Sequence, residues 1–338
     1  MIAPLATGQT SCYDLAGYEI PCKKSGQDGE SKQGLPWPQP RFISEGRLVE
    51  DKLTGLYWTL DANLAEYPLT WSEALRFVAE MNRVRKYGYG DWRLPNRHEL
   101  RSLICHQATR PALPSGHPFI HLFPGWYWTS TTAAISPAHA WYVHMQGGRM
   151  FYGGKDQSYL AWPVRGTSEV LPTTGQHRCY SSAGALVPCS GSGQDGEMRC
   201  GRPWPEPRFH DIGGGLLDSL TGLLWRLDAD LTGRRVNWGE ALESIDMLNR
   251  QEASNGPWRL PNINELESIT SCVEHTPALP PGARFKNLRD AYWSSTSSTF
   301  EPDWAWALYL DKGAIGVGQK TGAYFHVWAV CSSSRLLG

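Results

Sequence analysis

The amino-acid sequence contains one long unit twice, and this duplication constrains the fold more than any other feature. The segment 7–42 returns as 174–209, and the block Trp-Arg-Leu-Pro-Asn stands at both 92–96 and 258–262. A unit of this length far exceeds the roughly 20–50 residues of a solenoid repeat, so two tandem domains are expected. The predicted domains are residues 1–168 and 169–338, each opening with a cysteine hairpin (about 7–40 and about 174–207), with a short linker around 167–173.

Each copy has the sequence pattern of a small α+β domain. Thr70 and Glu73 have the spacing of a capping box, and apolar residues follow them at helical spacing. The same signal returns at Asn96, Asn237 and Asn262. The segments after the helices are aromatic, alternating and rich in glycine turns, which is typical of short strands. We therefore predict two short helices on a small, looped, mostly antiparallel sheet in each copy.

The composition argues against several partners. The chain has 338 residues with 32 Lys+Arg and 33 Asp+Glu, so its formal net charge is -1. This balance disfavours binding to nucleic acid or to an anionic membrane through bulk charge. No apolar run is long enough to span a bilayer, so membrane insertion is not expected.

A set of aromatic, glycine and charged residues recurs in the same order in both copies. In the first copy it comprises Asp51, Thr54-Gly55-Leu56, Trp58, Trp71, Glu73-Ala74-Leu75, Trp92 to Asn96, Glu99-Leu100, Tyr127 to Thr131, Ala140-Trp141 and Trp162 to Arg165. In the second copy Cys331 replaces Arg165 and Ala329 replaces Pro163. This set resembles the Lcl C-terminal domain family. The resemblance implies C-type lectin-like modules, similar in fold to formylglycine-generating enzymes, whose C-terminal strands and loops bind ligands; members characterised as adhesins bind glycosaminoglycans.

Two cysteine pairs recur at the same spacing in the two hairpins. We predict that Cys12 pairs with Cys22 and that Cys179 pairs with Cys189. Disulfides persist in oxidising compartments, so an exported protein is expected, extracellular or at the cell surface, with the periplasm as the alternative. Its leader peptide would then be missing from the sequence.

The other four cysteines do not recur. The lectin-like resemblance implies a bridge between Cys272 and Cys331, which occur only in the second copy. Cys105 and Cys200 are left open, as a bridge between the domains or as two free thiols. Because no C-x2-C spacing occurs, a structural zinc site is not expected.

No metal or cofactor is predicted, although two acidic motifs leave calcium as an alternative. Asp28 and Asp195 lie in the repeated Gly-Gln-Asp-Gly-Glu block, where a tight turn is a simpler explanation than a calcium ligand. Glu301 and Asp303 flank Pro302 in a triplet similar to those of calcium-dependent lectins. These last two carboxylates are the calcium candidates.

The divergence between the copies predicts a ligand-binding surface. Alternation places Trp141 and Val143 on one side of a strand, and Tyr142 and His144 on the other. The second copy keeps the first side apolar and changes the second, as expected of a recognition surface on a fixed scaffold. The predicted ligand-binding residues are Tyr142, His144, Gln146, Arg149, Phe151, Tyr152, Lys155 and Tyr159 in the first copy, and Tyr309, Asp311, Lys320 and Tyr324 in the second.

The function predicted from these features is non-enzymatic binding or adhesion. The sequence has no Gly-x-Ser-x-Gly elbow, phosphate-binding loop or His-Glu-x-x-His motif, so no catalytic residues are proposed. The expected partner is a glycan or a surface protein, and a homo-oligomer is left open. The alternatives are an oxidase of the formylglycine-generating type and a structural subunit of a surface assembly.

Overall fold

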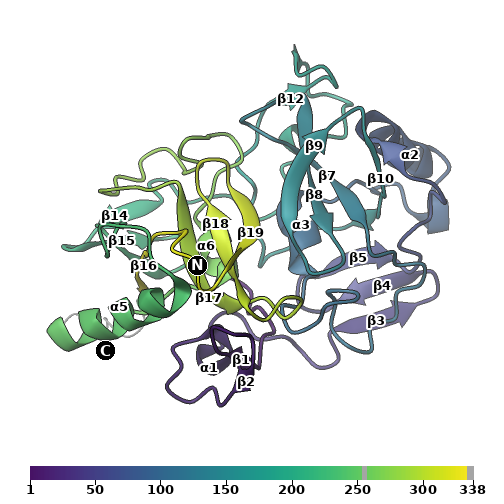
Figure 1. The fold of residues 1–338 in the computed structure, drawn as a ribbon. Coiled ribbons are helices and arrows are strands. Elements are labelled where there is room, and N and C mark those ends of the chain that lie inside the picture. Colours follow the sequence, from purple (N-terminus) through teal and green to yellow (C-terminus); the bar gives the residue numbers. More distant parts are fainter. Residues whose placement is uncertain (253–256, 333–338) are drawn as a thin grey trace. The chain divides into compact units, whose positions relative to one another are not determined.

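The computed structural model describes residues 1–252 and 257–332, which form two compact units. The first-repeat unit comprises Trp37–Pro203 and Ser271–Val273. The second-repeat unit comprises Met1–Pro36, Trp204–Thr270 and the described residues from Glu274 onward. Figure 1 labels the elements of both units.

The units differ from the expected division at residues 168 and 169. Residues 1–36, called hairpin 1, belong to the second-repeat unit, and residues 168–203, called hairpin 2, belong to the first-repeat unit. Each hairpin therefore packs on the body of the other repeat. Figure 1 shows the purple elements β1, β2 and α1 of hairpin 1 next to the strand β17, which lies more than 250 positions later in the sequence.

The first-repeat unit is built from antiparallel sheets and short helices. Its four-stranded sheet has the order β11-β5-β4-β3, and β7, β8 and β9 pair antiparallel in sequence order. The elements are β3 (Phe42–Glu45), β4 (Leu48–Asp51), β5 (Leu56–Thr59), β6 (Leu69–Thr70), α2 (Trp71–Arg83), η1 (Lys86–Gly88), α3 (Arg97–Ser102), β7 (Trp126–Thr132), β8 (His139–His144), β9 (Met150–Gly154), β10 (Ser158–Tyr159), β11 (Val164–Arg165), β12 (Cys179–Tyr180), β13 (Leu186–Val187) and α4 (Asp195–Met198).

The second-repeat unit repeats this plan. Its four-stranded sheet has the order β14-β15-β16-β20, and β17, β18 and β19 pair antiparallel. The elements are β1 (Cys12–Tyr13), β2 (Glu19–Ile20), α1 (Asp28–Ser31), β14 (Phe209–Asp211), β15 (Gly215–Asp218), β16 (Leu223–Arg226), α5 (Trp238–Gln251), α6 (Ile263–Ser268), β17 (Ala291–Ser297), β18 (Trp304–Tyr309), β19 (Ala314–Gln319) and β20 (Val330–Ser332).

The four predicted capping boxes are present and the α+β expectation is confirmed. In each box the side chain of the cap residue accepts a hydrogen bond from the Glu backbone, and the Glu side chain accepts one from the cap backbone. At the start of α3, buried Arg93 also forms a bidentate ion pair with Glu99, with N···O distances of 2.5 and 2.7 Å. Arg259 and Glu265 repeat this pair at α6. The repeated arginines thus fix the helix starts.

The two hairpin disulfides are confirmed, but the third predicted bridge is wrong. Cys12–Cys22 and Cys179–Cys189 are bonded. Cys331 is a free thiol in the apolar core of the second-repeat unit, on strand β20. Cys272 is not disulfide-bonded either, and its segment belongs to the first-repeat unit. The thiols of Cys272 and Cys331 therefore lie in different units. Cys105 and Cys200 are not disulfide-bonded either.

Hairpin 1 is held in the second-repeat unit by a buried carboxylate. Asp28 Oδ2 accepts hydrogen bonds from the hydroxyls of Thr7 and Thr296, both at 2.7 Å. Beside it, the Gln9 amide donates to the Ser297 carbonyl and accepts from the Ser297 N–H, at 2.7 and 3.0 Å. Burial raises the pKa of Asp28 to about 6. The Gly-Gln-Asp-Gly block therefore serves as a docking motif as well as a turn.

Hairpin 2 uses the same contacts in the first-repeat unit. Asp195 Oδ2 accepts from the hydroxyls of Thr174 and Thr131, both at 2.7 Å, and burial raises its pKa to about 6. The Gln176 amide accepts from the N–H of Thr132 and donates to its carbonyl, both at 2.9 Å. The blocks that are most alike in the two halves are therefore the ones that dock the hairpins.

A buried lysine completes each docking site. Lys155 is 1% exposed, lies 4.0 Å from the Trp71 ring centroid and donates to the Ser181 carbonyl of hairpin 2 at 3.3 Å. Lys320 is 0% exposed and donates to the Tyr13 and Asp14 carbonyls of hairpin 1 at 3.3 and 3.0 Å. Both lysines were predicted as ligand contacts. That prediction is wrong, because the hairpins cover them.

The docking assignment predicts where loss of a carboxylate weakens the protein. Asp28→Ala leaves two buried threonine hydroxyls without their acceptor, at a cost of about 1–3 kcal/mol. We expect faster amide exchange in β17, measured by hydrogen–deuterium exchange mass spectrometry, while β7 is unchanged. The matched variant Asp195→Ala should accelerate β7 and not β17. Acceleration of the opposite strand in either variant would contradict the docking assignment.

The buried lysines predict a pH dependence of stability. Burial lowers the pKa of Lys155 and Lys320 from 10.5 to about 7. Between pH 7 and 10 the unfolded chain therefore binds more protons, and the lysines' contribution to the free energy of unfolding rises with pH. Lys155→Met/Lys320→Met removes this rise. Urea unfolding from pH 6 to 10 measures it as the difference between wild type and variant; parallel curves would contradict the prediction.

Candidate functional site

The predicted alternation along β8 is confirmed. Trp141 and Val143 are buried, as is Met145 just after the strand. Tyr142 and His144, which point to the other side, are half-buried. One side of the strand therefore lies wholly in the core, and the other is buried at Ala140 and reaches the surface in part at Tyr142 and His144.

Four rings gather on the surface side of this sheet, and we call them the aromatic face: Trp126, Tyr142, His144 and Tyr159. Trp126 lies opposite His144 in the β7–β8 register. The Trp126 ring centroid lies 4.3 Å from that of Tyr142 and 4.6 Å from that of His144. Tyr159 lies 4.9 Å from Tyr142, and all four residues are half-buried. Because residue 153 is a glycine, the ring of Tyr142 can lie across β9. A Cβ on Gly153 would overlap this ring.

Burial disfavours charge on two side chains of the aromatic face. Partial burial lowers the pKa of His144 and raises the pKa of Tyr142 to about 12. His144 Nδ1 lies 2.7 Å from the Gln146 carbonyl oxygen, which fixes the ring. The Tyr159 hydroxyl donates to the Gln157 side chain at 2.9 Å. The face therefore offers apolar ring surface with hydroxyl and imidazole groups at its edges.

The structure divides the other predicted residues of the first repeat between different places. Phe151 lies opposite Tyr142 and shares its side of the sheet. Tyr152 lies opposite Trp141, so it is on the other side, with the two ring centroids 5.2 Å apart. Gln146 and Arg149 belong to the turn after β8, where the His144 N–H donates to the Arg149 carbonyl. The predicted set is therefore not one surface.

Sequence reasoning missed Trp126. Its neighbours Tyr127 and Trp128 form a repeated motif, and Trp126 stands just before it, where the second copy has Ala291. Comparing this position across the copies is the signal that would have found it. Its contact with His144 depends on strand register, which the sequence does not specify directly.

The corresponding surface of the second repeat is small. In the matching registers, Ala291 stands for Trp126, Ala307 for Tyr142 and Tyr309 for His144. Phe325 packs 4.6 Å from Trp293, as Tyr159 packs 4.8 Å from Trp128. The counterpart of Tyr159 is thus Phe325, and the predicted ligand contact Tyr324 is the residue before it. Tyr324 is 50% exposed, and Asp311 lies in the turn after β18, where its carbonyl accepts from Thr276.

The calcium candidates lie in the turn before β18. The Glu301 carbonyl accepts from Trp304 N–H, and the Asp303 carbonyl accepts from Lys320 N–H. Gly17 of hairpin 1 packs against this turn, since a Cβ on it would lie 2.8 Å from the Asp303 nitrogen. Within residues 1–252 and 257–332, no three His, Cys, Asp or Glu side chains are grouped to hold a metal ion.

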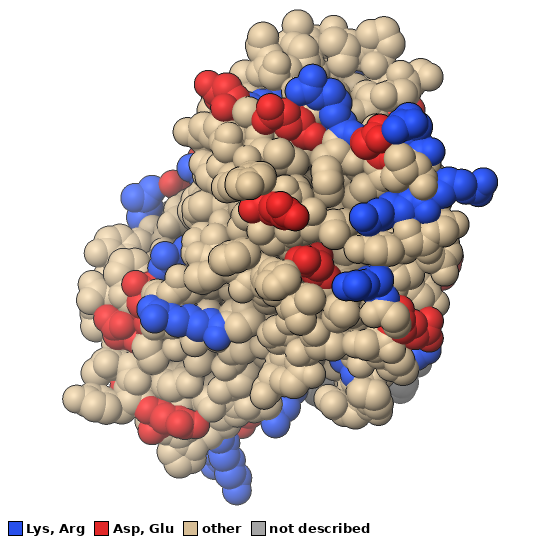
Figure 2. All heavy atoms as spheres, turned by 90° about the vertical axis from the view of Figure 1, so that its right-hand side faces the viewer, with Lys and Arg blue, Asp and Glu red and all other residues tan. Residues whose placement is uncertain are grey.

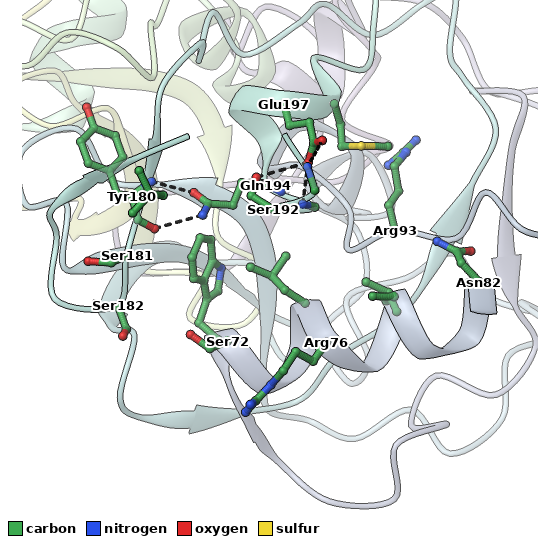
Figure 3. A pocket seen from close by; sticks show the side chains of 18 of the residues that line it. Ser72, Arg76, Asn82, Arg93, Tyr180, Ser181, Ser182, Ser192, Gln194 and Glu197 are labelled. Carbon is green, nitrogen blue, oxygen red and sulfur yellow. Dashed lines mark hydrogen bonds between the residues drawn. The ribbon is translucent and has the colours of Figure 1, made fainter. Parts of the chain in front are cut away.

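A groove of about 520 Å³ lies between helix α2 and hairpin 2 of the first-repeat unit (Figure 3). Leu75, Val78 and Met198 are among the apolar residues that line it. Its Gln194 already bonds both backbone groups of Tyr180, as the dashed lines in Figure 3 show. The groove joins segments about 100 positions apart, so no local sequence pattern indicates it.

Charge is evenly distributed on the face that Figure 2 shows. Lysine and arginine side chains are interspersed there with aspartate and glutamate, without a continuous patch of one sign. A ligand on this face would be recognised by local contacts rather than by a long-range field.

Comparison with known proteins identifies the family. In the described part of the chain, no helix is both long enough and apolar enough to cross a membrane. A comparison with curated proteins gives no match. The family model for the Lcl C-terminal domain matches residues 47–165 and 214–331, the bodies of the two repeats without their hairpins. The chain therefore belongs to the Lcl C-terminal domain family and contains two tandem copies of that domain.

Proposed function

We propose that this protein is a non-enzymatic binding module that holds a glycan or a protein ligand on the aromatic face of its first repeat. The supporting observation is the contrast between the repeats. Trp126 and Tyr142 stand on a strand pair whose counterpart carries Ala291 and Ala307. The scaffold is the same in both, so the rings are not required by the fold.

The chemistry of the aromatic face supports this role. Large rings supply contact area with few rotatable bonds, and their polar edges supply hydrogen bonds. The rings of Trp126 and Tyr142 contact each other at a tilt and are held by their neighbours, which reduces the entropy lost on binding. Flat rings of this kind suit the face of a sugar ring or the apolar side chains of a protein surface. The second repeat would be a weaker site or a spacer.

The proposed setting is the outside of a cell. The two disulfides are typical of proteins from an oxidising compartment, and they brace the hairpins that dock on each repeat body. Two helices on small antiparallel sheets are compatible with a C-type lectin-like fold, which we include in the proposal. In such a protein the described surface would act in adhesion or capture.

Replacing the aromatic face by its own counterpart tests the proposal. Trp126→Ala/Tyr142→Ala/His144→Tyr installs the residues of the second repeat on the first, so the scaffold should tolerate it. On a glycan and surface-protein array, we expect ligands of the wild type to lose about tenfold or more in affinity, as for central interface residues. A thermal melt checks that the variant is folded.

Tyr324→Ala is the matched control, because Tyr324 is exposed and lies in the second repeat. It should leave binding unchanged. If the triple variant binds as well as wild type, or if Tyr324→Ala alone abolishes binding, the aromatic face is not the site.

A further inference from the structure

The hairpin docking site is a recognition site for a defined peptide structure. On the second-repeat body it consists of Thr296, Ser297, Lys320, Asn262 and Asn264. The first three contact Asp28, Gln9 and the carbonyls of Tyr13 and Asp14. Asn262 donates to the Gln33 carbonyl at 3.2 Å, and Asn264 donates to the Leu5 carbonyl at 3.0 Å. The site thus binds the disulfide-closed hairpin 1 near both ends of the hairpin segment.

The first-repeat body reads hairpin 2 in the same way. Asn96 donates to the Cys200 carbonyl at 3.1 Å, and His98 Nδ1 lies 3.2 Å from the Pro172 carbonyl. The docking residues of the hairpins are identical, with Thr, Gln, Gln and Asp at 7, 9, 27 and 28 and again at 174, 176, 194 and 195. The contacts therefore recognise the motif that both hairpins share. Which hairpin docks on which body is then determined by the chain that connects them.

The connections of the two hairpins differ. Hairpin 2 follows directly after β11 of the body on which it docks. Hairpin 1 docks on a body that begins at Trp204, so the whole segment 37–203 lies between them in sequence. Its covalent connection to that body therefore runs through all of this segment. Its occupancy of the site is thus an intramolecular event, set by effective concentration.

We infer that the docking site of the second-repeat unit accepts hairpin 1 from a second copy of this chain. When two copies exchange their hairpins, every docking hydrogen bond is kept, because the same residues meet in the same geometry. The exchange forms no new interface and loses none. The balance between monomer and dimer then depends on protein concentration relative to the effective concentration within one chain.

Complementation between two defective full-length chains tests the inference. Gln9→Ala/Asp28→Ala weakens hairpin 1 and keeps the site, and Asn264→Ala/Lys320→Met weakens the site and keeps the hairpin. Each alone should be monomeric by light scattering after size exclusion. Their mixture should give a one-to-one dimer. The control partner carries all four substitutions, so a mixture of it with the first variant contains no intact hairpin 1 and should stay monomeric.

A second measurement traps the exchange covalently and does not depend on complementation. Gln9→Cys/Ser297→Cys places two thiols across a pair of residues in direct contact. Chains labelled with nitrogen-14 and nitrogen-15 are mixed over a range of concentrations and then oxidised. We expect cross-linked peptides of mixed isotope, in a share that rises with concentration. Same-isotope cross-links alone at every concentration, or a complementation mixture that remains monomeric while both variants are folded, would overturn the inference.

Discussion

The structure depends on one buried contact that occurs twice, a carboxylate that accepts two threonine hydroxyls. In the first-repeat unit, Thr131 Oγ1 donates to Asp195 and accepts from the N–H of Arg97 at the start of α3. Thr296 has the same position between Asp28 and Ile263. A hairpin, a strand and a helix start thus meet at one hydroxyl. Because the carboxylate is fully buried, it is stable there only with these donors in place.

The duplicated scaffold separates residues that the fold needs from residues that it does not. Trp128 and Trp293 both pack against an aromatic ring from the following segment, Tyr159 or Phe325. This contact is kept in size and place. At the neighbouring position the first repeat has Tyr142 and the second has Ala307, and the strand register is the same in both. A position free to vary from alanine to tyrosine beside an invariant core is a position on which selection for a ligand can act.

Local patterns were predictable from the sequence, and long-range pairings were not. The capping boxes at Thr70 and Asn96 and the Cys12–Cys22 bridge each involve residues close in sequence, where spacing alone carries the information. Lys155 looked like a surface residue because nothing near it in the sequence reveals that hairpin 2 covers it. Trp126 was missed for the same reason, since its partner is set by register. Because the docking residues of the two hairpins are identical, the sequence also did not indicate which body each hairpin docks on.

Hairpin docking and the aromatic face are physically connected in the first-repeat unit. The Ser181 carbonyl of hairpin 2 accepts from Lys155, whose ammonium lies over the ring of Trp71. Trp71 in turn donates to the Thr129 carbonyl of β7 and packs in one apolar cluster with Trp128, against which Tyr142 lies. Release of the hairpin would leave Lys155 without these acceptors, beside the Trp71 and Trp128 cluster against which Tyr142 packs. In the function we propose, a firmly docked hairpin would hold the rings in place for a ligand, since rigid support lowers the entropy that binding must overcome.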